Sequence, residues 1–132
     1  MKLLLAATAT VLCLSSVAEA NQITRTVPSG KTSVVFTYKP ENRSCESAFG
    51  VATLIAKPQH GQVSHHLVGT EFTTALNDRS GTPIGCRGRP TTGFAVTYTP
   101  DPGFHGVDHF TLDVQQPEMN RHHMDGFAII VE

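Results

Sequence analysis

The chain has 132 residues with 10 lysines and arginines, 11 aspartates and glutamates, and a net charge of −1 at pH 7. Neither sign forms a run, which argues against a basic groove for nucleic acid and against a polybasic membrane patch. The length fits one domain and is too short for two.

Residues 1–20 are predicted to be an export signal. Lys2 precedes an apolar stretch over residues 3–17, and the small-x-small triplet 18–20 follows it. Threonines and serines interrupt the stretch, which is shorter than the roughly 20 apolar residues of a spanning helix. We therefore expect cleavage after Ala20, no integral membrane segment in the mature chain, and a secreted or periplasmic protein. The alternative is lipidation at Cys13, which lacks the small residues that normally precede a lipidated cysteine.

The mature chain, residues 21–132, is predicted to be a single all-β domain. Short runs rich in Val, Ile, Thr, Phe and Tyr recur between turn residues, and no helical period is sustained. Phe94, Val96 and Tyr98 alternate with smaller or more polar residues, which predicts a strand with one face in the core. The expected strands are 22–27, 32–38, 50–56, 62–67, 71–75, 94–99, 109–115 and 126–131. The fold class is thus a β-sandwich of about seven or eight strands.

One disulfide is expected in this domain. Cys45 and Cys86 remain after the signal is removed and enter an oxidising compartment, where we expect them to bond. The open alternative is two free, buried thiols. Each cysteine lies in a long irregular stretch, so the bond would join two loops, and loops on a rigid scaffold often carry recognition. The candidate binding residues beside the bond are Glu46, Arg79, Arg87 and Arg89.

Residues 98–112 contain a motif that points to a family. Its positions are Tyr98, Pro100, Gly103, Phe104, Gly106, Asp108 and Phe110. Together with the proline, two residues and glycine of 58–61, it resembles bacterial immunoglobulin-like and cadherin-like domains, which occur as tandem repeats in large extracellular proteins. The resemblance implies an immunoglobulin-like sandwich in which Phe104 plugs one end and Asp108 hydrogen-bonds the turn. The cysteine pair is not part of that repeat pattern.

A copper site is the alternative function. Met119 and Met124, both methionines of the mature chain, lie in one loop with His122 and His123. Thioether and imidazole ligands together suit copper. Methionine in a hairpin is more often a packing residue, and neighbouring histidines in a strand point to opposite faces.

Other metals and catalysis have less support in the sequence. Asp101, Asp108 and Asp125 lack the dense oxygen cluster of a calcium loop, and His105 and His109 show no zinc spacing. No nucleophile elbow or framed carboxylate pair occurs, so we predict no enzymatic activity and no cofactor. The principal hypothesis is a non-enzymatic binding or structural module of the periplasm or cell surface with a protein or glycan partner.

Overall fold

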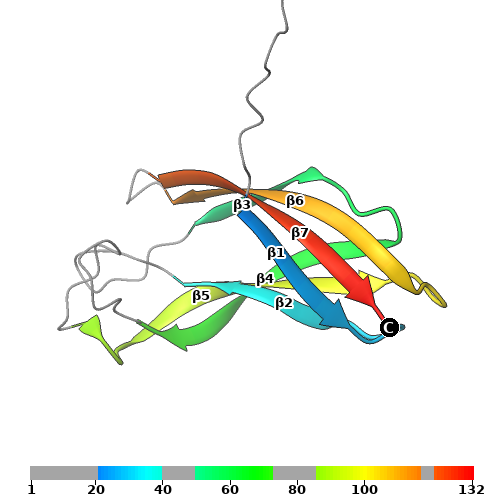
Figure 1. Cartoon of the computed structure of the whole chain (residues 1–132). Helices are drawn as coiled ribbons and strands as arrows, with labels where there is room; N and C mark the ends of the chain where they lie inside the picture. The colour runs from blue at the N-terminus through cyan, green and yellow to red at the C-terminus, as the bar shows by residue number, and fades with distance from the viewer. Residues whose placement is uncertain (1–20, 40–49, 73–85, 117–120) are drawn as a thin grey trace, which may run out of the picture.

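The computed structural model describes residues 21–39, 50–72, 86–116 and 121–132, and within them seven strands form two layers (Figure 1). One sheet has the order β1 (Asn21–Val27), β7 (Arg121–Val131), β6 (Gly106–Gln116) and β3 (Val51–Ala56). The other has the order β2 (Ser33–Tyr38), β5 (Pro90–Pro100) and β4 (Gly61–Glu71). β1 and β7 are parallel, whereas the other pairs are antiparallel. The expected all-β sandwich is confirmed for the described residues.

Several expected strand boundaries are wrong. β5, β6 and β7 begin at Pro90, Gly106 and Arg121 instead of at 94, 109 and 126, so residues 122–124, expected in a loop, lie in a strand. Glu71, predicted to begin a separate strand, is the last residue of β4, which pairs with β5 without interruption from Gly61. Gly69 lies between the two expected strands, yet it pairs with Thr92, and a Cβ there would meet nothing within 4 Å. A strand tolerates glycine where no packing partner is lost. Residues 73–75 lie outside the described residues.

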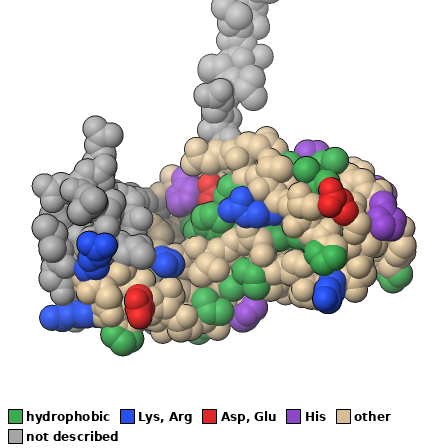
Figure 2. Space-filling view, turned by 60° about the horizontal axis from the view of Figure 1, so that its bottom comes forward, with side chains coloured by type: hydrophobic (Ala, Val, Ile, Leu, Met, Phe, Trp, Pro, Cys, Tyr) green, Lys and Arg blue, Asp and Glu red, His purple; other side chains and the backbone are tan. Residues whose placement is uncertain are grey.

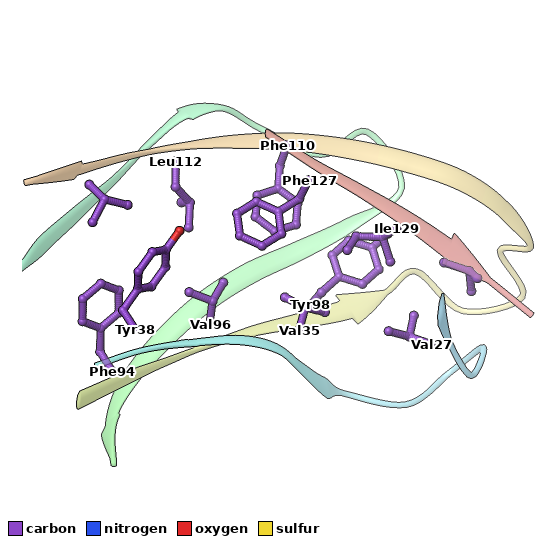
Figure 3. Close-up of a cluster of buried hydrophobic side chains, with 12 residues drawn as sticks. Val27, Val35, Tyr38, Phe94, Val96, Tyr98, Phe110, Leu112, Phe127 and Ile129 are labelled. Carbon is purple, nitrogen blue, oxygen red and sulfur yellow. The ribbon is translucent and has the colours of Figure 1, made fainter. Parts of the chain in front are cut away.

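The core lies between the two layers (Figure 3). Phe110 and Phe127 are register partners on β6 and β7, and their rings stack with centroids 4.4 Å apart. The opposite sheet contributes Val96 and Tyr98, both with no exposed area. The predicted inward face of β5 is therefore confirmed.

On the side formed by β1 and β2, a side chain bridges the two sheets. Nε of Arg25 on β1 donates a hydrogen bond to the Val35 carbonyl of β2 at 2.9 Å, and its guanidinium lies over the Phe36 ring at 6.0 Å. β2 also shifts register between Val34 and Phe36. A charged side chain and a bulge are two common ways in which proteins prevent an edge strand from pairing with another chain.

Candidate binding surface

The opposite side of the sandwich, formed by β3 and β4 and called the open side below, contains a hollow of about 420 Å³. Phe94 is 6% exposed and contributes a buried aromatic wall, whereas Val51 and Leu67 are 56% and 63% exposed. The full lining is Gly50, Val51, Ala52, His65, His66, Leu67 and Phe94. Exposed apolar side chains that line a concave surface favour binding of apolar groups.

The hollow exists because β3 and β4 are edge strands of different sheets. Alternation places Val63, His65 and Leu67 on the same face of β4. Val63 packs against the core, but Leu67 extends beyond it and stays exposed. Within the described residues, no strand joins the two layers on this side.

The open side is nearly free of charge. β3 has no ionisable side chain, and β4 has only His65 and His66 near its middle and Glu71 at its end. The His65 ring meets the Phe94 ring edge to face, with centroids 6.1 Å apart. Elsewhere, charged side chains of both signs are scattered over the face in Figure 2 and do not gather into a patch of one sign.

A hydrogen-bonded cluster fixes the aromatic wall of the hollow. The Tyr38 ring stacks on Phe94 with centroids 4.7 Å apart, and its hydroxyl donates to Oδ2 of Asp125 at 2.5 Å. Nε2 of His123 lies 3.3 Å from the same oxygen. Asp125 is 4% exposed, so this buried carboxylate ties β2 in one sheet to β7 in the other.

A second buried carboxylate lies towards the opposite end of the sandwich. Asp108 accepts hydrogen bonds from the backbone N–H groups of Gln59, His60 and His109, each at 2.9 Å, and from the Tyr98 hydroxyl at 2.8 Å. Burial would raise the pKa of Asp108, but these hydrogen bonds outweigh it and lower the pKa. Asp108 therefore accepts hydrogen bonds from a turn, but this turn is 58–61, between β3 and β4, and not the turn of the motif itself.

Phe104 packs against the core beside this turn. Its ring stacks on His60 with centroids 4.3 Å apart, and the Ser29 hydroxyl donates to its carbonyl at 2.9 Å. Gly103 has φ 77° and Gly106 has φ 137°, which are backbone conformations that favour glycine. These contacts give a structural reason for the motif's pattern.

The two tyrosines of the chain, Tyr38 and Tyr98, are both buried beside these carboxylates. Burial is the largest cause that raises the pKa of each phenol above its usual value. The hydrogen bond to the neighbouring carboxylate, Asp125 for Tyr38 and Asp108 for Tyr98, and the negative charge of that carboxylate raise the pKa further.

We expect neither tyrosine to ionise near pH 10 in the folded protein. The unfolded chain loses phenol protons near pH 10, so the free energy of unfolding should fall above that pH and stay insensitive to these groups below it. Ultraviolet absorbance of phenolate, followed together with circular dichroism, checks this. Phenolate that appears near pH 10 while the circular dichroism stays native would contradict it.

The three proposed copper ligands that the structure describes, His122, His123 and Met124, do not share one face of β7. His122 has Nε2 2.5 Å from Oδ1 of Asp113, whereas His123 faces Asp125 on the other side of the strand. Met124 pairs in register with Asp113 and is 42% exposed. Alternation therefore groups His122 with Met124 alone. In the described ranges, no three His, Cys, Asp or Glu side chains converge as a metal site.

Met119 lies outside the described residues, so the four-residue copper site stays a prediction. The binding role of the cysteine-bearing loops also stays a prediction in part, because Cys45, Glu46 and Arg79 lie outside the described residues.

Cys86 begins a compact turn. It has no exposed area and is not a free thiol, but its pairing with Cys45 stays a prediction. Arg87 and Arg89 are exposed on this turn. The backbone of Phe72 accepts from Gly88 N at 3.1 Å and donates to Arg89 O at 3.0 Å. The structure thus fixes the turn's backbone and leaves both arginines in solvent.

The open side was not among the predicted sites. One signal was present in the sequence: residues 51–56 contain no charge, proline or glycine, although edge strands usually carry such protection. Edge position follows from sheet order, which the sequence does not show.

No protein-family model, curated protein or solved structure matches the chain. None of the described residues belongs to a helix long and apolar enough to cross a membrane.

Proposed function

We propose that this chain is an exported, non-enzymatic binding module that takes an extended apolar polypeptide segment at its open side. The observation that carries the proposal is the hollow beside Phe94, which lies between two edge strands with almost no charge. An edge strand offers unpaired backbone N–H and C=O groups to a partner strand, and the hollow offers a pocket for its apolar side chains. A protein partner is favoured over a glycan because the lining has few hydrogen-bonding side chains.

We further propose that the sandwich is immunoglobulin-like, and its strand order supports this. In immunoglobulin-like sandwiches, the third, sixth and seventh strands share one sheet, and the second, fourth and fifth share the other. β3, β6 and β7 lie together here, as do β2, β4 and β5. β1 joins β7, which places it in the sheet opposite to the one that the first strand of a constant-type domain occupies.

Export and the Cys45–Cys86 disulfide belong to the same proposal. The apolar leader at residues 1–20 supports export. Burial of Cys86 in a turn hydrogen-bonded to Phe72 supports a structural bond there. Such a bond is compatible with an oxidising compartment.

Selection of random peptides on the immobilised, exported protein tests the proposal. We expect apolar peptides that bind wild type and lose at least about tenfold in affinity on Leu67→Asp or Val51→Asp, since burial of one apolar side chain contributes roughly 1.5–3 kcal/mol. Val107→Asp is the matched control, because Val107 is a comparably exposed valine, 53%, on β6.

Peptides that bind Leu67→Asp and wild type equally would place recognition elsewhere. If no peptide binds above background, the proposal is wrong.

A further inference from the structure

β4 differs from the other three edge strands among the described residues in how it is protected. Arg25 closes the side of β1 and β2, and β2 and β3 each contain a register shift, at Val34/Phe36 and Leu54/Ala56. β4 has no such shift, because all eleven of its residues pair regularly with β5. A long, regular edge strand is a template for pairing with another chain.

The composition of β4 also permits such pairing. It contains no lysine, arginine, aspartate or proline, which are residues that commonly protect an edge. Leu67 is the most exposed large hydrophobic residue that the structure describes, at 63%. No described strand lies on the free edge of β4.

We infer that the segment bound at this edge is β4 of a second copy, paired antiparallel about a two-fold axis. This inference rests on the proposed function and names the partner of the same surface. Two-fold pairing over the full length of β4 brings the middle of the strand against the middle of its copy. It also places Glu71 near the opposite end of the partner's strand, where the turn carries Lys57, a charge of opposite sign.

The two-fold axis brings histidines together. His65 and His66 are the fifth and sixth of eleven residues in β4, so antiparallel pairing sets them near the same residues of the copy. The other ionisable groups close to the strand are Glu71 and Arg89 at one end, and at the other end Lys57, His60, Asp101 and Asp108; β3 has none. Neutral imidazoles permit the contact, whereas protonated ones repel each other, so the dimer weakens in acid.

Sedimentation velocity over a range of concentrations tests the inference. We expect the exported wild-type protein to be dimeric at pH 8 and to dissociate at least about tenfold more readily at pH 5. Leu67→Lys should be monomeric at both values, and the matched control Val107→Lys should behave as wild type. Because Leu67 is largely exposed, Leu67→Lys should keep the native fold, as judged by its circular dichroism spectrum.

Amide hydrogen exchange of wild type at low and high concentration gives a second measurement that needs no variant. Protection that rises with concentration in residues 61–71 supports the inference. A wild-type protein that is monomeric at all concentrations, a dimer unaffected by Leu67→Lys, or protection confined to other strands would overturn it. A monomeric protein that binds peptides would overturn self-pairing and leave the binding function intact. A monomeric protein that binds no peptide would overturn both the inference and the proposed function.

Discussion

Gly93→Ala is expected to lower the free energy of unfolding by at least about 3 kcal/mol. A Cβ at this position would lie 2.4 Å from the Tyr38 carbonyl oxygen, which belongs to the neighbouring strand β2. The backbone cannot rotate away as a side chain can, so β2 and β5 must separate. The shift would also disturb Tyr38, whose ring and hydroxyl hold Phe94 and Asp125.

Thermal unfolding measures this effect, and a loss of this size corresponds to a fall of on the order of 15 °C in the melting temperature. Gly69→Ala is the control, since Gly69 lies in the adjacent strand β4 and a Cβ there meets nothing within 4 Å. It should be neutral or slightly stabilising. Equal melting temperatures for the two variants would refute the assigned cause.

Asp108→Asn is expected to cost about 3 kcal/mol at pH 7. Each carboxylate oxygen of Asp108 accepts two hydrogen bonds. An amide keeps one acceptor and turns its NH₂ group towards two donors, so two charge-assisted bonds are lost. The turn at residues 58–61 loses its attachment to β6 as a result.

The pH dependence of the free energy of unfolding tests whether the ionised carboxylate of Asp108 is the cause of this stabilisation. Because the pKa of Asp108 is lowered in the folded state, its contribution to stability is present above the ordinary carboxyl pKa and is lost as pH falls through the folded value. Denaturant unfolding from about pH 5 to pH 2 should therefore show a smaller acid loss for Asp108→Asn than for wild type. The exposed Asp101→Asn is the control. If Asp108→Asn loses as much stability between pH 5 and pH 2 as wild type does, this explanation is wrong.

Local patterns predicted the strands well where hydrophobic alternation is strong. Phe94, Val96 and Tyr98 are buried as expected, and residues 127–131, apolar on both faces, form most of the buried length of β7. The strand boundary at Glu71 was wrong because the sequence alone does not show that the strand continues through Gly69. Its pairing with Thr92, 23 residues away, keeps it in the strand.

Side-chain interactions that join distant segments could not be predicted. Tyr38 and Asp125 are 87 residues apart, and Asp108 is 49 residues from Gln59. No periodicity links such positions, because their contact depends on how the sheets stack. The hollow of the open side has the same origin, since it follows from which strands lie at the edges.

The parallel pairing of β1 with β7 has a mechanical consequence (Figure 1). Seven positions pair from Asn21 with Asp125 to Val27 with Val131. Opposite pulling forces applied at Asn21 and Glu132 act along both strands, so they load the hydrogen bonds of this pair together in shear. An antiparallel pair pulled from its open ends would lose its bonds one after another. Tension along the chain must therefore rupture this seam as a unit before the sandwich can extend.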